Sequence, residues 1–394
     1  MAGAADVTAC IVARNEARVL EECITSLQGA AAEVLLVDHG STDDTAVIAS
    51  RAGARVLRSD SPHHEIARNT YLEAAHTPWV IVIDADERLS SRARSAIPAL
   101  VAGAAPHVMG FALKRFDWIG AGRWAETHLV RLFRVDPRIR YFRSRAHASV
   151  VPAIEECGGF VAAADAPIHH LDALLPRDHL AKRAGMRARL EAEVGDGGLA
   201  VMRCFLALEL FANGEDDAAA AQLRDAIAQN ARCAPIARLF LAQNHRVRGR
   251  FDEAARVAQQ VLDDTKAFRG RTNAWVTLAD ARDRLGDTKG AIAACRGGLV
   301  EDGSSAALHL DLAALLVESD RESARRHFEA ALRENAWLVS RRTFAEGAPS
   351  CVFQQQDSLL ARVPRGDVLA ATLGVDLADV IALQEEHRAA TILR

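Results

Sequence analysis

Three acidic side chains follow a short apolar stretch of the sequence. Asp84, Asp86 and Glu87 come directly after residues 79–83, which read Trp-Val-Ile-Val-Ile. Carboxylates at the end of a buried strand need a positive partner, because the loss of their solvation is costly. Mg²⁺ or Mn²⁺ would supply it, since these cations prefer oxygen ligands and keep open positions for phosphate oxygens. A structural alternative is an acidic turn before a helix that begins near Ser90, and these residues alone do not exclude it.

The neighbouring elements indicate where these acids lie. Apolar, β-rich runs cover residues 7–12, 33–37, 54–57 and 79–83, and segments with helical spacing separate them. Strands that alternate with helices and are apolar throughout predict a parallel sheet covered on both faces. Ligands bind beyond the carboxyl ends of such strands, which is where Asp38 and the acids at 84–87 fall.

From residue 111 to about 166 the pattern changes to shorter β-like pieces separated by charged and aromatic residues. These pieces are residues 111–113, 129–133, 141–142 and 148–151. We expect them to complete one domain that covers residues 1–178.

Beyond about residue 178 the sequence reads as helix and contains an internal repeat. The pair Leu-Ala recurs at 206–207, 241–242, 278–279 and 312–313. In the first three copies a glycine follows at a turn, and an alanine lies five positions after it. Stacked helical hairpins are therefore predicted for residues 179–345, and they resemble the tetratricopeptide repeat (TPR). A generic Ala-rich bundle is the alternative, and residues 346–394 are expected to form a tail with a last helix at 376–390.

Four polar segments occur in a fixed order in the first domain. They are ARNEA after the first apolar run, VDHGSTDDT after the second, ARN at 67–69 and IDADE at 83–87. Together they resemble the family 2 glycosyltransferases, whose pattern has N-x-E, V-D-x-G-S-x-D-x-T, A-R-N and D-x-D at these places. The resemblance implies an α/β domain with the GT-A fold and a Rossmann-like mixed sheet, followed by the all-α, TPR-like domain. It also divides the first domain into a nucleotide-sugar half at 1–110 and an acceptor half at 111–178.

The resemblance implies a role for each matching residue. Asp86, with help from Asp84, would hold Mn²⁺ or Mg²⁺ on the diphosphate of a nucleotide-diphosphate sugar donor. The chain is then expected to be an inverting hexosyl- or N-acetylhexosaminyl-transferase. The nucleotide sugar itself would contact residues from the ends of the first strands and from the helix before the acids, namely Arg14, Asn15, Glu16, Asp38, Arg68 and Asp84.

The catalytic base is the point where the sequence departs from the family. Residues 131–134, which read RLFR, and His147 resemble a block of the branch that includes lipopolysaccharide-core and peptide glycosyltransferases. In that block a glutamate follows the histidine, whereas Ala148 takes its place here. His147, Glu126 and Asp117 are the candidate bases, in that order. An acceptor that needs little help, such as a thiol, is the remaining possibility.

Two adjacent histidines also match this branch, in which a histidine commonly follows the last strand of the domain. They are His169 and His170. An imidazole can be a third ligand of Mn²⁺ or can contact a phosphate. We therefore include His169 in the expected metal site, with a structural histidine as the alternative.

Composition limits the classes of partner that the protein is expected to bind and the cellular compartment in which it is expected to lie. The formal net charge of −4 arises from 52 acidic and 48 basic residues, so no overall field favours nucleic acid. No run approaches the roughly 18 apolar residues of a membrane helix, and the N-terminus lacks the basic segment of a signal peptide. The 7 cysteines are scattered without a C-x-x-C pair, as is typical of reduced thiols. We expect a cytoplasmic protein without an integral membrane segment.

The sequence permits three hypotheses about function, two of which differ in the acceptor. Stacked hairpins form an extended surface that suits a chain-like ligand, so a peptide or protein acceptor leads. A saccharide or lipid-linked acceptor, with the repeats serving for homodimerisation, is also permitted. The missing glutamate favours a third hypothesis, a binding protein on a catalytically retired scaffold. A nucleotidyltransferase would need a Gly-rich, basic phosphate loop after the first strand, and residues 13–16 offer none.

Overall fold

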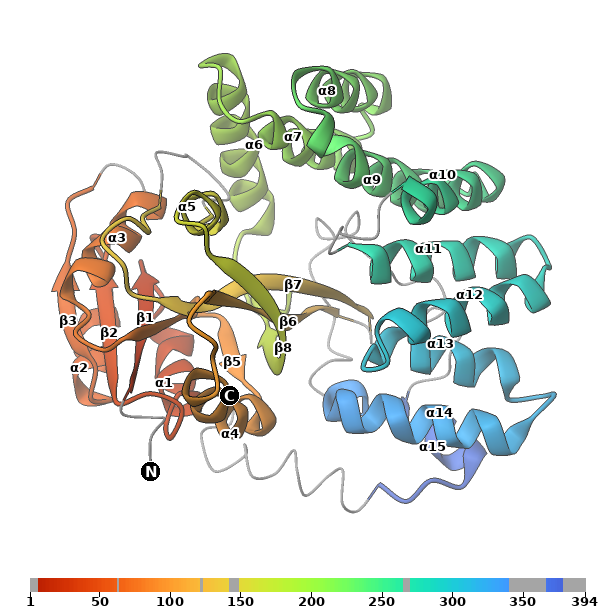
Figure 1. Cartoon of the computed structure of the whole chain (residues 1–394), viewed down its shortest axis with the longest axis horizontal. Coiled ribbons are helices and arrows are strands. Elements are labelled where there is room, and N and C mark those ends of the chain that lie inside the picture. The colour runs from red at the N-terminus through yellow and green to blue at the C-terminus, as the bar shows by residue number, and fades with distance from the viewer. Residues whose placement is uncertain are drawn as a thin grey trace. The chain divides into compact units, whose positions relative to one another are not determined.

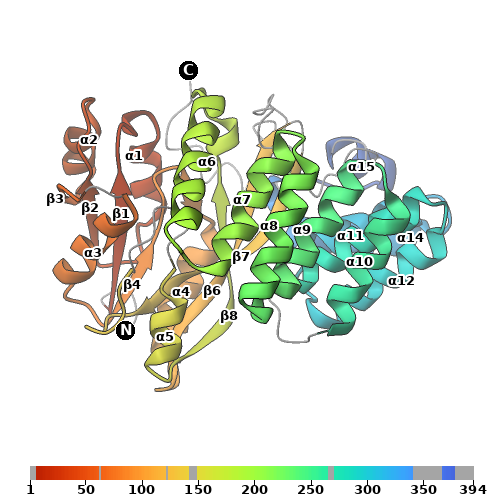
Figure 2. The same cartoon turned by 90° about the horizontal axis from the view of Figure 1, so that it is seen from above.

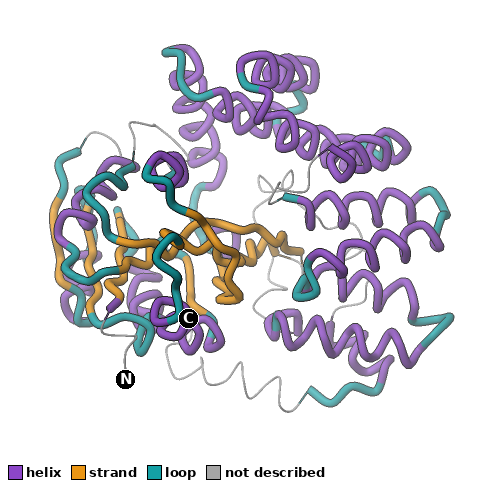
Figure 3. The backbone as a smooth tube through the Cα atoms, viewed as in Figure 1, coloured by secondary structure: helices purple, strands orange, loops and turns teal. Residues whose placement is uncertain are grey.

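The computed structural model describes residues 6–61, 64–120, 123–141, 149–264, 270–339 and 366–377. The chain divides into two compact units, whose elements are labelled in Figure 1. The first unit comprises residues 1–117 and 127–172, and the second comprises residues 118–126 and 173–394. Nearly all strand residues belong to the first unit, and the described part of the second is almost wholly helical (Figure 3).

The first unit is built on one sheet, which has eight strands in the described residues. The strands are β1 (Val7–Ala13), β2 (Glu33–Asp38), β3 (Arg55–Arg58), β4 (Trp79–Val82), β5 (Glu87–Leu89), β6 (Val108–Gly120), β7 (Arg123–Arg134) and β8 (Phe160–His170). Their order is β3-β2-β1-β4-β7-β6-β8-β5. The pairs among β3, β2, β1 and β4 are parallel, whereas β4–β7 and β5–β8 are antiparallel. The sheet is mixed, so the predicted α/β class and the four predicted N-terminal strands are confirmed.

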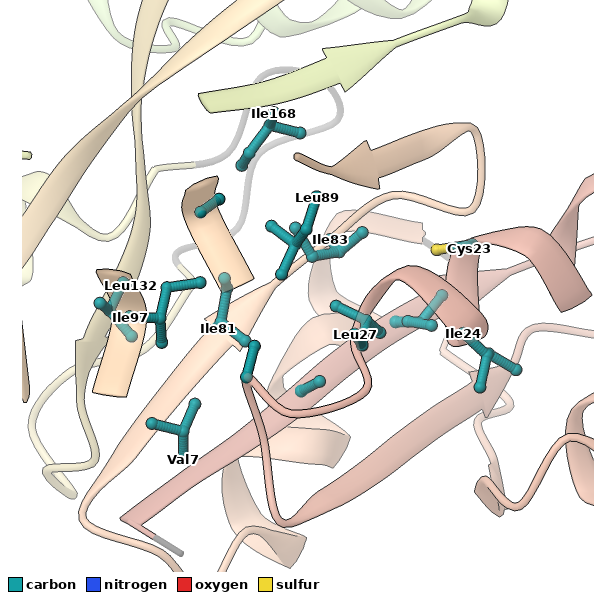
Figure 4. Close-up of a cluster of buried hydrophobic side chains, with 14 of the residues drawn as sticks. Val7, Cys23, Ile24, Leu27, Ile81, Ile83, Leu89, Ile97, Leu132 and Ile168 are labelled. Carbon is teal, nitrogen blue, oxygen red and sulfur yellow. The ribbon is translucent and has the colours of Figure 1, made fainter. Parts of the chain in front are cut away.

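Two apolar clusters cover the two faces of the parallel strands. Alternate residues of β1 enter them: Val7, Ala9 and Ile11 join one cluster, while Cys10 and Val12 join the other. Figure 4 shows the first cluster, where side chains of β1, β4 and the helix after β1 gather. Both faces are buried, which explains why these strands are apolar throughout. The helices of this unit are α1 (Ala17–Ser26), α2 (Thr45–Arg51), α3 (His64–Ala74), α4 (Ser91–Ala102) and α5 (Val151–Glu156).

The later part of the first unit differs from the short pieces that the sequence predicts. Residues 111–113 and 129–133 belong to two long strands, β6 and β7. The prediction of β structure at 148–151 is wrong at its described residues: Ser149 and Val150 lie outside any strand, Val151 begins α5, and Pro152 lies in the first turn of that helix. Proline suits this place, since its missing N–H would have no partner there.

The second unit is a series of antiparallel helical hairpins. Its helices are α6 (His179–Gly195), α7 (Ala200–Ala212), α8 (Asp216–Gln229), α9 (Ala234–Val247), α10 (Phe251–Asp264), α11 (Arg271–Arg284), α12 (Thr288–Glu301), α13 (Ala306–Leu316), α14 (Arg321–Glu334) and α15 (Gly366–Leu373). From α7 to α14 each helix packs on the next one along the chain, and Figure 2 shows α7, α8 and α9 side by side. The predicted helical-repeat, TPR-like domain is confirmed.

The repeat signature has a local physical cause. Gly214, Gly249 and Gly286 have φ of 80°, 75° and 81°, a left-handed conformation that ends the first helix of each hairpin at little cost. Each of the alanines five positions later is fully buried against a neighbouring helix. These alanines are Ala219, Ala254 and Ala291. A larger side chain would hold the helices apart, which is why the small residue recurs.

The tip of the β6–β7 hairpin packs within the second unit. The ring of Trp118 lies 6.1 Å from that of Trp337, at an interplanar angle of 24°. Glu126 Oε2 accepts hydrogen bonds from Ser305 Oγ (3.4 Å) and from the backbone N–H of Ala307 (3.3 Å), at the N-terminus of α13. Trp118 and Glu126 are each 2% exposed. The hairpin tip is therefore an integral part of the second core.

Little of the C-terminal tail is described. The predicted helix at 376–390 lies outside the described residues from 378 onward. In the described ranges, no helix is both long and apolar enough to span a bilayer. The described cysteines are free thiols, and Cys351 lies outside the described residues.

Candidate functional site

The acids at 84–87 form a tight turn between β4 and β5. The backbone N–H of Glu87 donates to the Asp84 carbonyl (2.9 Å), and the backbone N–H of Asp84 donates to Glu87 Oε2 (3.0 Å). β5 then pairs with the end of β8, and the N–H of Leu171 donates to the Asp86 carbonyl (3.0 Å). The turn therefore places Asp86 beside the residues that follow β8. The helix that begins after Ser90 is also present, and Ser90 rather than an acid caps it.

Asp84 lies between two arginines. Its Oδ1 accepts from Arg68 Nη2 (2.9 Å), and its Oδ2 accepts from Arg131 Nη2 (2.6 Å). Burial raises the pKa of Asp84, but Arg131 and Arg68 lower it further, so the pKa lies well below its usual value. Asp84 is therefore an ionised anchor for two cations rather than a member of the metal-ligand group described next.

Asp86, His170 and Asp172 come together at one place in the first unit. One potential ligand atom from each lies within 4.8 Å of the others, and His170 Nε2 is 3.6 Å from Asp86 Oδ1. Two carboxylates and an imidazole form an oxygen–nitrogen donor set that can hold a divalent cation such as Mn²⁺. The described residues thus fit a metal ion beyond the end of β4.

Asp117 lies behind His170, on the side of the ring away from Asp86. Asp117 Oδ1 is 2.7 Å from His170 Nδ1 and 2.8 Å from Arg115 Nη2. Burial raises the pKa of Asp117, whereas Arg115 and the hydrogen bond to His170 lower it, and the resulting pKa is about 2. Burial and Arg115 lower the pKa of His170, but Asp86 and Asp117 raise it above the usual value.

The structure corrects the choice between the two histidines. In the register of β6 with β8, His169 is opposite Phe116 and His170 is opposite Asp117. Successive strand residues face opposite sides of a sheet, so the two imidazoles point away from each other. His169 is 4% exposed and its ring lies 5.6 Å from that of Phe116. The expectation that His169 joins Asp86 is wrong in this geometry, because His170 takes that position.

The loops after β1 and β2 are tied together. Asn15, which has a φ of 58°, accepts at Oδ1 from the N–H of Thr42 (2.8 Å) and donates its own N–H to Ser41 Oγ (3.1 Å). Asp38 Oδ1 accepts from the N–H of Ser41 (3.0 Å). Glu16 joins through its N–H to Thr45 Oγ1 (2.9 Å), and Arg14 is exposed in the same loop. The residues after these two strands that are predicted to bind the nucleotide are thus neighbours at the carboxyl edge of the sheet.

The three candidate bases have different outcomes. His147 lies outside the described residues, as does Ala148. Glu126 is buried in the second unit, where it binds the N-terminus of α13. Asp117 is held by His170 and Arg115, and its low pKa makes it a weak proton acceptor. The contacts of Glu126 and Asp117 therefore suit structural roles better than general-base catalysis.

Several residues of this site were not predicted from the sequence. Glu87 is fully buried, and its Oε1 accepts from Arg131 (2.5 Å) and pairs with Arg115 (3.2 Å). The sequence carried weak signals for some of them: Asp172 follows His170 by two positions, and Arg131 belongs to the RLFR segment. Neither signal indicates which acid each side chain meets, because that depends on the sheet order.

Comparisons with known proteins find a family match in the N-terminal part of the chain. Residues 8–152 match the family model described as glycosyl transferase family 2. A TPR repeat-containing protein of Synechococcus elongatus is 35% identical over 143 residues, which are 36% of this chain and 35% of that protein. A lipopolysaccharide core biosynthesis glycosyltransferase of Rhizobium meliloti is 33% identical over 156 residues, covering 37% of this chain and 57% of that protein. The chain thus spans less than two thirds of the length of either relative.

Two solved structures have local similarity to parts of this chain. Glucosyl-3-phosphoglycerate synthase from Mycobacterium tuberculosis, crystallised with Mn²⁺ and UDP, is 26% identical, with a TM-score of 0.25 over 28% of this chain and 44% of that chain. Pseudomonas aeruginosa pilF is 18% identical, with a TM-score of 0.35 over 54% of this chain and 90% of that chain. Both scores are low.

Proposed function

We propose that this chain, which carries a glycosyl transferase family 2 domain over residues 8–152, moves a sugar from a nucleotide-diphosphate sugar to an acceptor and needs a divalent metal to do so. The observation that carries the proposal is the group of Asp86, His170 and Asp172 beyond the end of β4. Ligands of open α/β sheets bind at this edge.

Asp86, His170 and Asp172 would hold Mn²⁺ or Mg²⁺. When bound, the ion would stabilise the negative charge that develops on the departing diphosphate. We propose that Asn15 and Asp38 contact the nucleotide, and the support is their position at the ends of two neighbouring parallel strands. The same role is proposed for Arg14 and Glu16, in the loop of Asn15, and for Arg68, which binds Asp84.

The proposed reaction is a single displacement with inversion. An acceptor atom forms a bond to the anomeric carbon while the bond from that carbon to a diphosphate oxygen breaks, and the nucleoside diphosphate departs. The proton of the acceptor must pass to a base. Of the three candidates we retain His147, because Glu126 and Asp117 are engaged in the contacts described above.

We propose a peptide or protein as the acceptor. The support is the series of helical hairpins from α7 to α14, since stacked repeats create long surfaces that bind extended chains. A saccharide or lipid-linked acceptor is the second candidate, because one relative is a lipopolysaccharide core biosynthesis glycosyltransferase. In that case the repeats would serve to form a homodimer.

The test is transfer by the purified full chain. The chain is incubated with mixed nucleotide sugars, Mn²⁺ and either peptide or oligosaccharide acceptors, and the products are weighed by mass spectrometry. A mass increase of one hexose or one N-acetylhexosamine on a peptide supports the proposal and identifies the sugar class. An increase on the oligosaccharides alone, together with a dimer in light scattering, would favour the second candidate.

Asp86→Ala is expected to lower transfer and donor hydrolysis by at least about 100-fold, the usual cost of losing one group that stabilises developing charge. Asp165→Asn is the control, because Asp165 pairs with Arg92 on an exposed part of β8 and has no contact with the metal group. Donor binding without turnover by the unaltered chain, across all donors, would instead indicate a binding protein on a retired scaffold.

A further inference from the structure

The pairing of β6 with β8, which favours His170 over His169 as the proposed metal ligand, also gives His170 a fixed partner. β6 and β8 run in parallel, and their register places Asp117 opposite His170. The carboxylate Oδ1 lies 2.7 Å from the ring Nδ1, and the opposite ring nitrogen, Nε2, lies 3.6 Å from Asp86 Oδ1. The imidazole therefore lies between a carboxylate at one ring nitrogen and the metal group at the other.

This arrangement determines which ring nitrogen carries the proton. An ionised carboxylate can only accept hydrogen bonds, so the proton between the two groups belongs to Nδ1 of His170. In the neutral imidazole, Nε2 then presents its lone pair toward Asp86 and Asp172. A histidine that donates one N–H to a carboxylate is the usual arrangement around a protein-bound metal.

We propose that Asp117 is a positioning residue that fixes the tautomer and the ring orientation of His170 for metal binding. The inference rests on the proposed function, since it assumes that Asp86, His170 and Asp172 hold the metal. It assigns Asp117 a role different from that of a base, and it explains why a partly buried acid lies next to the histidine.

Asp117 is itself held in place by other residues of the hairpin. Thr127 Oγ1, on β7, donates to Asp117 Oδ2 (2.9 Å), and Arg115 Nη2 lies 2.8 Å from Oδ1. Arg115 also pairs with Glu87, the residue that closes the acidic turn. One network therefore supports both Asp86, through its turn, and His170, through its ring.

Binding of Mn²⁺ alone, without donor or acceptor, tests the role directly. Electron paramagnetic resonance of free Mn²⁺, checked by calorimetry, gives the dissociation constant for the full chain and for Asp117→Ala and Asp117→Asn. We expect Asp117→Ala to weaken binding by about 10- to 100-fold, as is typical when the partner of a metal-ligating histidine is removed. Asp117→Asn should bind more tightly than Asp117→Ala, because the amide oxygen can still accept from Nδ1–H.

A control variant and a measurement of folding distinguish the loss of a positioning role from a general loss of structure. Asp165→Asn, on the same strand as His170, should bind Mn²⁺ like the unaltered chain, and the thermal unfolding of each variant shows whether it folds. If the unaltered chain binds Mn²⁺ and folded Asp117→Ala binds it equally well, the positioning role is overturned and the proposed function stands. If the unaltered chain binds no Mn²⁺, the metal-dependent function fails, and the inference fails with it.

Discussion

At the scale of single residues, the acids of the turn divide their roles according to their partners. Asp84 is bound by Arg68 and Arg131, whereas Asp86 faces His170 and Asp172. A carboxylate that already has two cationic partners gains little from a third, so we propose Asp86 as the acid that binds the metal. The division explains why two aspartates separated by one residue need not act as a pair.

Another acid, Asp311 in α13, is compensated less well, because Arg246 offsets the effect of its burial only in part. It is 4% exposed, and the described structure shows no hydrogen-bond partner for its Oδ2. Burial and the nearby Asp280 raise its pKa well above the usual value. A carboxyl with a raised pKa in the folded chain adds stability below its unfolded pKa of about 3.9, and this contribution is lost as the pH rises through the folded pKa.

Asp311→Asn should therefore raise the melting temperature at pH 7 and leave it almost unchanged near pH 4. The measurement is thermal unfolding of both chains across that range. The difference between the two chains is the informative quantity, because acids with lowered pKa values, such as Asp84 and Asp117, give the opposite dependence in both. A variant that melts lower than the unaltered chain at pH 7 would show that Asp311 has a partner worth keeping.

The sequence predicted the residue types of the candidate site better than their partners. Asp38, Asp84 and Asp86 could be found because they follow apolar runs, and the runs fix the edge of the sheet. The sequence could not predict that His170 rather than His169 lies beside Asp86, since this depends on how β8 pairs with β6. The burial of Glu126 in the second unit was equally hidden, because it requires knowing where the hairpin ends.

At the scale of elements, the helical hairpins depend on small residues where helices approach closely. Gly298 lies in α12, and a Cβ added there would be 2.5 Å from Leu308 Cδ1 and 2.9 Å from Trp275 Cβ. Such distances require the neighbours to move. The side chains of Leu308 and Trp275 together occupy the space that a larger residue at 298 would need.

Gly298→Ala is expected to destabilise the chain, because overpacking costs about 1–3 kcal/mol and outweighs the gain of up to about 1 kcal/mol in helix propensity. Gly185→Ala in α6 is the matched control: no atom lies within 4 Å of an added Cβ there. That variant should be stabilised by up to about 1 kcal/mol. Denaturant unfolding that moves both variants in the same direction would contradict the packing argument.

The elements themselves were predictable where one local pattern dominates. β1 to β4 and the helical hairpins followed from runs of apolar residues and from the repeated Leu-Ala and Gly signals. The β6–β7 hairpin appeared in the sequence only as fragments, since its strands contain buried charged residues such as Lys114, Glu126 and Arg131. Polar residues inside a strand interrupt the apolar pattern on which the prediction relies.

At the scale of the whole molecule, the boundary between the units runs through a strand. Asp117 counts with the first unit and Trp118, the next residue of β6, with the second. Trp118 and Trp124 are each 2% exposed, and their rings lie 5.8 Å apart. The indole of Trp118 also stacks on that of Trp337, which lies far along the chain.

A fragment of residues 1–172 should therefore expose both tryptophans and bind a hydrophobic dye such as ANS more strongly than the full chain. It is expected to associate in light scattering, because large exposed apolar patches promote association. The same fragment with Trp118→Ser and Trp124→Ser should bind less dye and associate less. A monomeric, dye-free fragment with both tryptophans present would refute this expectation.

The placement of the hairpin tip also bears on how such chains can be recombined. The chain crosses between the units at 117/118, at 126/127 and again at 172/173, so one cut does not separate them. A helical array borrowed from another protein could not simply be fused after residue 172. It would have to bring a matching replacement for residues 118–126. The hairpin tip, rather than the junction at 172/173, therefore limits which helical arrays could replace the second unit.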